Sequence, residues 1–411
     1  MAPITRVNTA GLGANGRSAR MRGAVRAGVR VPDSVLRGAG IWVPSGSSFG
    51  AVGSCGEDAS RPGGLSALSF PEARSLFQGE RLSDVYQDEL GNVYGRLPGD
   101  GQTRPLIVSA HLDTVFPAGT DLQVLRQPGR IYGPSIGDNS LGVAGLFGLL
   151  WALQQGGITL PGDVWLVANV GEEGLGNLNG MRAVVTRFQD QPLAYIVLEG
   201  MALGQVYHRG LGVRRYRIEF HTAGGHSWVD YGQPSANHEL AYFVTQLTSL
   251  QLPLRPRTTL NVGVIAGGFS VNTIAAQAHF ELDLRSEGIE ELEGLSAQVE
   301  ELVNRSQRPN LQISARLIGD RPAGELPATH PLVTLVAGSL EAVGVTPVLN
   351  IGSTDANIPL SLGLPAICIG LTAGSGAHTL KEYILTNPVG QGLMQVLLTV
   401  EAAFKQLARI D

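Results

Sequence analysis

Four short apolar segments of the chain are predicted to be buried strands, and each ends on polar or glycine-rich sequence. They cover residues 105–110, 163–170, 195–198 and 366–370. Continuous apolar runs of this length are typical of strands that are covered on both faces in an α/β fold. Ligands bind beyond the carboxyl ends of such strands. The pattern therefore predicts one crevice where polar side chains from four strand ends converge.

The pattern also predicts a strand pair before these segments and a helix between the first two. The strand pair lies around residues 85–97, broken at 90–92, and the helix runs from about 140 to 155 after the polar turn at Asp138. Its apolar stretch, 141–153, is too short to cross a bilayer and follows a turn. We therefore expect a buried helix and no membrane span.

The order of the expected elements changes between residues 204 and 319. They are a strand at 213–221, a helix at 235–250, strands at 259–265 and 277–285, a helix at 288–306 and a strand at 311–317. This βαββαβ order predicts a sheet with helices on one face, which can fold alone and offers an exposed edge for self-association. We expect a larger domain of residues 71–203 and 320–411, with 204–319 inserted.

The length and composition are those of a folded α/β chain with two cores. A chain of 411 residues exceeds the usual size of one core, and 43% hydrophobic with 16% charged residues excludes a disordered chain. The formal net charge of -5 provides no basic field for nucleic acid. Cys55 and Cys368 lie far apart in the sequence, so a metal site must use nitrogen and oxygen ligands.

Residues 1–70 differ from the rest of the chain. Seven arginines lie between Arg6 and Arg37, against the single acid Asp33. The segment lacks the apolar core of a secretory signal, and we expect a cytoplasmic location. The expected structure is a poorly ordered extension, or a start site placed too early. A transit-like or nucleic-acid-binding tail is the alternative.

Polar residues with possible chemistry begin at the end of the first strand. His111 and Asp113 leave the strand at alternate positions, so the histidine can face the crevice while Asp113 supports its ring nitrogen. The alternative is a polar strand end that makes turn hydrogen bonds. Asp138 is either a helix cap or a carboxylate that bridges two cations.

Glu172 and Glu173 are adjacent acids directly after the second strand. Adjacent side chains diverge, so one can bind metal while the other holds the attacking water. This division suits general-base catalysis, because a carboxylate bound to metal is a poor proton acceptor. Two solvated loop acids are the alternative interpretation.

Glu199 follows the third strand, and His378 follows the glycine-rich turn after the fourth. With the earlier strand-end residues they complete a set that matches two nitrogen and oxygen metal sites sharing one aspartate. The set is His111, Asp138, Glu173, Glu199 and His378.

Five motifs in this order resemble those of the dizinc peptidases and deacylases, the family of carboxypeptidase G, acetylornithine deacetylase, succinyl-diaminopimelate desuccinylase and aminoacylase. They are HLDTV at 111–115, GDNS at 137–140, GEEG at 171–174, LEG at 198–200 and GAH at 376–378. The resemblance covers residues 85–411. It implies a zinc-peptidase-like catalytic domain with a mixed sheet flanked by helices, and a ferredoxin-like insertion that serves as lid and dimerisation domain.

The resemblance also implies two divalent metal ions. The ligands would be His111, Asp138 and Glu199 for one zinc ion, and Asp138, Glu173 and His378 for the other. Asp113 would orient His111, and Glu172 would be the general base. Cobalt or manganese could replace zinc, because the same ligand types accept all three.

Four further residues match positions that bind substrate or complete the site in this family. They are His226, Asn272, Arg285 and Gly376. The resemblance implies that His226 reaches the site of the partner in a homodimer and steadies the tetrahedral oxyanion. It implies that Arg285 binds a substrate carboxylate, for which its planar fork is suited. Alternatively, His226 is an ordinary loop histidine, and Arg285 pairs with Asp283 or Glu287.

The chain departs from the family pattern at two places. Many members have a lysine after the aspartate, where this chain has Asn139 and Ser140. The amino-terminal helix with its serine-rich motif is not recognisable in residues 1–70.

Glu199 bears on the substrate. A glutamate there resembles the carboxypeptidase and N-acyl-amino-acid group, whereas aspartate is typical of the aminopeptidases. The expected reaction is hydrolysis of an amide bond in a small peptide or N-acyl amino acid with a free carboxylate. One alternative is aminopeptidase or dipeptidase activity at the same site. A second is a non-catalytic metal-binding protein, against which the presence of Glu172 argues. A third is a dimetal phosphoesterase, but the motifs of that class are not found.

Overall fold

The strands predicted from the apolar segments lie together in one large sheet of the computed structural model, which describes residues 70–80 and 82–409. The expectation for the amino-terminal extension lies outside the described residues, Phe70 excepted. The sheet has nine strands in the order β1-β2-β6-β3-β7-β17-β8-β15, with β16 also paired to β8. Their bounds are Ser83–Gln87 (β1), Val93–Leu97 (β2), Leu106–His111 (β3), Val164–Asn169 (β6), Ala194–Glu199 (β7), Gln205–Gly210 (β8), Gly324–Glu325 (β15), Val348–Gly352 (β16) and Ala366–Gly370 (β17).

The middle of the large sheet is parallel. β3 is parallel to β6 and β7, and β7 is parallel to β17. At the edges, β2 is antiparallel to β1 and β6, and β8 is antiparallel to β17. The sheet is therefore mixed, as the resemblance implied. Because β6, β3, β7 and β17 run in one direction, their carboxyl ends open on the same edge of the sheet.

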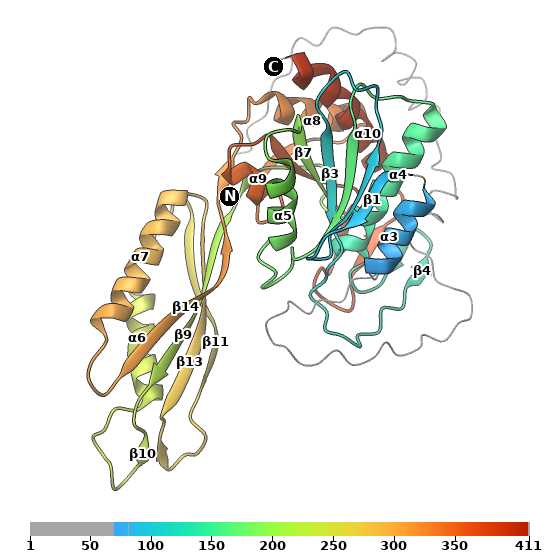
Figure 1. Cartoon of the computed structure of the whole chain (residues 1–411). Coiled ribbons are helices and arrows are strands. Elements are labelled where there is room, and N and C mark those ends of the chain that lie inside the picture. The colour runs from blue at the N-terminus through green and yellow to red at the C-terminus, as the bar shows by residue number, and fades with distance from the viewer. Residues whose placement is uncertain (1–69, 81, 410–411) are drawn as a thin grey trace.

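Helices cover both faces of the large sheet (Figure 1). They are α3 (Phe70–Gly79), α4 (Leu141–Gly156), α5 (Asn179–Phe188), α8 (Pro331–Ala342), α9 (Asn357–Ser361) and α10 (Val389–Gln406), with short turns at Ile136–Ser140 and Leu407–Arg409. The stretch Ile136–Gly156 is long and apolar enough to cross a membrane, but 78% of its most apolar part is buried inside the protein. It is a core helix, as predicted.

A second sheet stands beside the first (Figure 1) and has the order β11-β13-β9-β14, with every neighbouring pair antiparallel. Its elements are β9 (Gly212–His221), α6 (Ala236–Thr248), β11 (Thr258–Gly267), β13 (Gln277–Ser286), α7 (Ile289–Arg305) and β14 (Gln312–Arg321). They follow in the predicted βαββαβ order. Phe220, Phe243 and Phe280 meet in its core, which is separate from the core of the large sheet.

The insertion begins one strand later than predicted. β8 was expected in the insertion, but it pairs with β16 and β17 in the large sheet. Its alternating burial resembles that of the second sheet, so the sequence pattern alone could not assign it. β14 extends to Arg321, beyond its predicted end at 317. The chain therefore passes between the sheets at Leu211 and Pro322; residues 212–321 are called the small unit and the other described residues the large unit.

Two smaller sheets arrange loops. β4 (Leu125–Gln127), β5 (Arg130–Tyr132), β18 (Gly374–Ser375) and β19 (Tyr383–Leu385) pair in the order β18-β19-β5-β4. This sheet brings the chain before Asp138 next to the loop of His378. In the small unit, β10 (Gly225–His226) pairs with β12 (Thr273–Ile274).

Candidate dimetal centre

The five predicted metal ligands lie at the carboxyl end of the large sheet. His111 is the last residue of β3, Glu199 is the last of β7, and Glu173 follows β6. Asp138 lies in the turn before α4, and His378 lies between β18 and β19. Because β6, β3 and β7 are neighbours, their ends bring these side chains to one place.

The Asp138 carboxylate lies between the two histidines. Its Oδ1 is 3.2 Å from Nε2 of His111, and its Oδ2 is 3.1 Å from Nε2 of His378. Glu199 Oε2 is 3.8 Å from His111 Nε2, and Glu173 Oε1 is 3.3 Å from His378 Nε2. In each of the two predicted ligand sets, the ligand atoms lie within 4.8 Å of one another. The geometry matches two sites that share Asp138, with one oxygen for each.

The atoms of the cluster fit divalent cations. Within the described part of the chain, Nε2 of His111 and Oε1 of Glu173 are buried and make no hydrogen bond. Buried polar atoms without a partner are rare in folded proteins. Imidazole nitrogen and carboxylate oxygen are ligands that zinc, cobalt and manganese accept. Two such ions would give both atoms a partner.

The carboxylates of the cluster repel one another. Burial, together with the charges of Asp138 and Glu172, raises the pKa of Glu173 to about 8. Burial also raises the pKa of Glu199 well above its ordinary value. Ionisation of both acids would crowd negative charge into a largely buried site, and divalent cations would relieve this repulsion.

Both histidines hold protons strongly between these acids. The Asp138 carboxylate raises the pKa of His378 to about 9. Burial alone would lower the pKa of His111, but the Asp113 and Asp138 carboxylates outweigh it and raise that pKa well above its ordinary value. Binding of metal ions would displace these protons, because only the neutral imidazole is a ligand.

Asp113 contacts both His111 and the loop that contains Glu172 and Glu173. Its Oδ1 accepts the backbone N–H of Glu172 at 3.2 Å, and its Oδ2 accepts that of Glu173 at 2.8 Å. Nδ1 of His111 lies 3.0 Å from the carbonyl oxygen of Asp113 and 3.6 Å from its Oδ1. The backbone of Asp113 is thus the nearer partner of the imidazole, and its carboxylate fixes the glutamates relative to β3.

Glu172 lies beside the cluster with a partner that the sequence analysis missed. Glu172 is buried, and one of its oxygens lies within 4.8 Å of ligand atoms of His111 and Glu173. Its Oε1 accepts a hydrogen bond from Nη1 of Arg321 at 3.2 Å. A carboxylate at this place can reach a metal-bound water. Glu172 and Arg321 are 149 positions apart in the sequence, so no local pattern could indicate the contact.

Glu382, also missed, fixes the turn that carries Asp138. Its Oε1 accepts the backbone N–H groups of Gly137 at 2.7 Å and Asp138 at 2.8 Å, and its Oε2 accepts that of Ser135 at 3.1 Å. Glu382 is fully buried, and this burial raises its pKa. The only sequence signal was an acid shortly after His378.

Asn139, one of the departures from the family pattern, holds the strand of Glu199. Its Nδ2 donates to the carbonyl of Leu198 at 2.9 Å, and its Oδ1 accepts the N–H of Gly200 at 2.8 Å. Both residues flank Glu199. The amide therefore ties the turn of Asp138 to the end of β7, so that ligands of the two sites are placed together.

A further acid that sequence analysis missed lies under the site. Asp355 is fully buried, and its Oδ2 accepts a hydrogen bond from Asn169 Nδ2 at 2.6 Å. Burial and the charge of Glu172 raise the pKa of Asp355 to about 7. When ionised, it adds negative charge near Glu172 and His111.

Two residues implied to complete the site lie far from the cluster of their own chain. β10, which contains His226, is at the end of the small unit away from the large sheet (Figure 1). Asn272 is its neighbour, since the N–H of Ser227 donates to the Asn272 carbonyl at 3.1 Å. The structure therefore does not bring His226 and Asn272 to the cluster within one chain.

Arg285 and Gly376 lie elsewhere. Arg285 is near the end of β13, where its Nε donates to Asp283 Oδ2 at 2.6 Å, as the alternative interpretation expected. Gly376 has a φ of 81° and precedes His378 by two residues. This left-handed backbone favours glycine.

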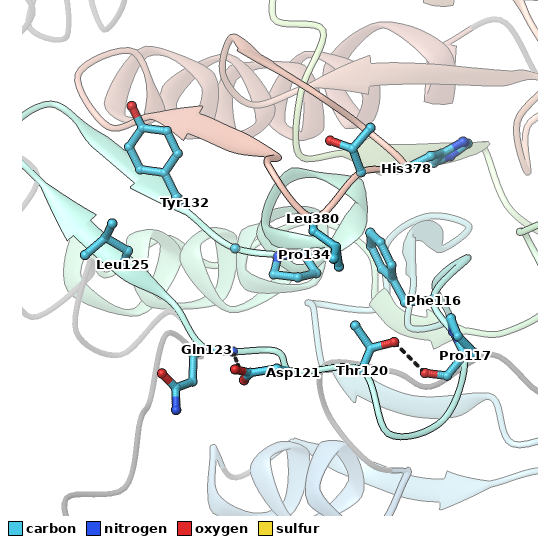
Figure 2. Close-up of a pocket in the computed structure, with 12 residues that line it drawn as sticks. Phe116, Pro117, Thr120, Asp121, Gln123, Leu125, Tyr132, Pro134, His378 and Leu380 are labelled. Carbon is cyan, nitrogen blue, oxygen red and sulfur yellow. Dashed lines mark hydrogen bonds between the residues drawn. The ribbon is translucent and has the colours of Figure 1, made fainter.

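A hollow of about 880 Å³ opens beside His378 (Figure 2). Phe116, Tyr132 and Leu380 are among its lining side chains. Its one acid, Asp121, accepts the backbone N–H of Gln123 at 3.0 Å, and no lysine or arginine is among the described residues that line it. The hollow suits an apolar group better than an anionic one.

Comparison with known proteins gives a family and a relative. Residues 107–401 match the model of "Peptidase family M20/M25/M40". The chain is 24% identical over 351 residues to N-formyl-4-amino-5-aminomethyl-2-methylpyrimidine deformylase of Bacillus subtilis (strain 168), which covers 73% of this chain and 80% of the relative.

Solved structures share the fold. A tripeptidase of Staphylococcus aureus aligns with a TM-score of 0.70 at 19% identity, covering 84% of this chain and 95% of that one. The Bacillus subtilis protein YXEP, a dinuclear metal-binding peptidase, aligns with a TM-score of 0.60 at 14% identity, covering 84% and 95%. The family model spans well over half of the sequence and confirms the resemblance. The chain belongs to the M20/M25/M40 peptidase family of metal-dependent hydrolases.

Proposed function

We propose that the protein hydrolyses an amide bond in a small peptide or N-acyl amino acid that has a free carboxylate. The observation that carries this proposal is the Asp138 carboxylate between His111 and His378, with Glu172 beside them. The deformylase relative cleaves an N-acyl bond by its name, and the tripeptidase with the same fold cleaves peptides by its name. Both belong to the proposed reaction class.

Two divalent ions, zinc or else cobalt or manganese, would be held by the five ligands of the cluster. When bound, they polarise the amide carbonyl and lower the pKa of a bound water. Glu172 would take the proton of that water and deliver it to the leaving nitrogen. Asp113 holds the backbone of Glu172, so the base keeps its place relative to β3.

The two ends of the substrate would meet different surfaces. Nε of Arg285 is bound to Asp283, and among the described residues nothing accepts from its two Nη groups, which leaves them for a carboxylate. The hollow beside His378 would take an apolar acyl group or side chain. N-succinyl substrates would be poor, because no lysine or arginine is among the described residues that line that hollow.

The experiment is hydrolysis of a substrate panel by metal-loaded protein, comparing wild type with Glu172→Gln at equal metal content. The panel contains N-acetyl, N-benzoyl and N-succinyl amino acids, dipeptides and tripeptides. We expect apolar N-acyl amino acids or peptides to be cleaved, and Glu172→Gln to lower kcat by about 100-fold or more with both metals bound. Wild type that binds two metals and cleaves nothing in the panel would contradict the proposal. Cleavage limited to peptides with a free amine would favour the aminopeptidase alternative.

We propose that the protein is a homodimer in which His226 completes the partner's site. His226 is far from its own cluster, and the loops beside β10 expose apolar side chains. Trp228 is 86% exposed, Tyr231 90% and Phe269 86%, more than isolated surface residues explain. β11 adds an open edge at the side of the small sheet.

Mixing two inactive variants tests this dimer. His226→Ala and Glu172→Gln, unfolded and refolded together, should regain about a quarter of wild-type activity, because half of the dimers are mixed and each has one complete site. Light scattering should give the mass of two chains. A monomer, or no recovery on mixing, would contradict the role of His226 in trans.

A further inference from the structure

A buried amide joins the two crossings between the units. The chain crosses at Leu211, after β8, and at Pro322, after β14. Asn357 is fully buried, and its Nδ2 donates to the carbonyl of Leu211 at 2.8 Å and to that of Pro322 at 2.9 Å. One side chain of the large unit therefore holds both crossings.

Beside the second crossing, Arg321 reaches the loop of the two glutamates. Its Nη1 donates to Oε1 of Glu172 at 3.2 Å and to Oγ of Ser353 at 3.3 Å. Its Nη2 donates to the carbonyl oxygens of Glu172 and Gly174. The Arg321 side chain is 8% exposed and that of Glu172 is 9% exposed. Burying a guanidinium is costly unless it is paired and hydrogen-bonded, so these bonds hold both groups in place together.

Other side chains fasten the same loop to the small unit without touching the Glu172 carboxylate. The N–H of Asp320 donates to Asn177 Oδ1 at 2.6 Å, and Nη2 of Arg182 donates to the Asp320 carbonyl at 2.6 Å. Arg215, in β9, donates from Nη1 to the carbonyl of Gly174 at 2.6 Å. The loop is thus bonded to both β9 and β14, the strands next to the two crossings. Of these contacts, only that of Arg321 reaches the carboxylate of Glu172, the proposed base.

We propose that Arg321 is a positioning residue for Glu172, and that through it the orientation of the small unit controls where the base lies. The inference rests on the proposed role of Glu172. Arg321 occupies Oε1, and no described residue donates a hydrogen bond to Oε2, which stays available for the water proton. Because Arg321 belongs to β14, a rotation of the small unit moves the guanidinium and the carboxylate with it. A misplacement of about 1 Å lowers a rate by about 100-fold.

Arg321→Met tests the proposal, with Arg182→Met as the matched control. Arg182 holds the neighbouring Asp320 carbonyl but does not contact Glu172. With both metals bound, Arg321→Met should lower kcat by about 100-fold while KM changes by less than about threefold, and Arg182→Met should leave kcat within about threefold. Equal losses of kcat in the two variants would show a purely structural role and overturn the proposal.

A double variant shows whether Arg321 acts through Glu172. Adding Arg321→Met to Glu172→Gln should lower kcat no further, because the group to be positioned is already gone. A further loss as large as in the wild-type background would contradict the proposal. If Arg321→Met does not fold, Arg321→Lys replaces it in the test. Lysine keeps the positive charge but lacks the planar guanidinium with its several donors, so kcat should fall by about tenfold. Wild-type kcat in Arg321→Lys would also overturn the proposal.

Hydrogen exchange gives a readout that needs no substrate. The amides of Glu172 and Glu173 should exchange faster in Arg321→Met, and at the wild-type rate in Arg182→Met. If wild type cleaves no amide and this difference is present, the proposed function fails while the positioning contact stands. If the difference is absent, the inference about Arg321 fails.

Discussion

Asp138 is the residue on which both proposed metal sites depend. Each of its oxygens faces a different histidine, at 3.2 and 3.1 Å. Burial alone would raise the pKa of Asp138, but His111 and His378 outweigh it and lower that pKa. The carboxylate therefore stays ionised beside acids that retain protons, which suits a bridging ligand.

Replacing Asp138 by asparagine should remove both metal ions, because the amide offers one neutral oxygen where two charged ones are needed. We expect kcat/KM to fall by about a thousandfold, since a metal ion contributes several kcal/mol to charge stabilisation. Elemental analysis after dialysis measures the metal. Asp121→Asn, an acid in the neighbouring hollow, is the control and should keep both ions. Full metal content in Asp138→Asn would contradict the shared-ligand geometry.

The raised pKa values predict that metal binding releases protons. In the metal-free protein, Glu173 with a pKa of about 8 and His378 with a pKa of about 9 are mostly protonated at neutral pH. The apparent metal affinity should therefore rise with pH and level off above about pH 9. Calorimetry in buffers with different ionisation heats counts the protons. Affinity that does not change between neutral pH and pH 9 would contradict the shifts.

The same shifts set the stability of the metal-free protein. Both folded-state pKa values lie above the ordinary values of 4.5 and 6.5. The stability from holding these protons is present in full at low pH, and it is lost as the pH rises through about 8 and then about 9. Urea unfolding should show this loss in metal-free protein, and a smaller one after metal loading.

At the scale of elements, sequence analysis predicted the ends of the strands but missed the side chains that hydrogen-bond to the loops following them. A strand such as β3 is a local pattern, and His111 at its end follows directly from it. The partners of the ligands come from distant parts of the chain: Glu382 lies 244 residues from Asp138. Such contacts depend on how elements pack, which periodicity does not encode. β8 was misassigned for the same reason, because its alternation fits either sheet.

Glu382→Ala tests the bracing of the turn before α4. The change leaves the N–H groups of Ser135, Gly137 and Asp138 without their acceptor in a buried place. We expect the free energy of unfolding to fall by about 1–3 kcal/mol or more, and metal binding to weaken. Urea denaturation and metal titration measure both effects. Glu382→Gln keeps one acceptor oxygen, so its free energy of unfolding should lie between those of Glu382→Ala and wild type. If Glu382→Ala is as stable as wild type, the turn does not depend on Glu382 for its stability.

At the scale of the molecule, two units with separate cores meet at two chain crossings and one shared loop. The proposed metal ligands belong to the large unit, whereas Arg321 and Arg285 belong to the small one. A site divided in this way would depend on the angle between the units, as we propose for Arg321. Asn357 is the side chain that holds both crossings, so it should set that angle.

Asn357→Leu keeps a similar volume and removes the donor to the carbonyls of Leu211 and Pro322. Each buried carbonyl left without a donor costs about 1–3 kcal/mol. Because each unit has its own core, the variant should stay folded and lose the fixed angle, which small-angle scattering would show as a wider range of particle shapes. kcat should fall as Arg321 moves from Glu172. Asn350→Leu, which removes a bond to Gln205 at 2.9 Å inside the large sheet, is the control and should change neither quantity. If Asn357→Leu keeps the wild-type scattering and kcat, the crossings are held by other contacts, and the angle between the units does not depend on this amide.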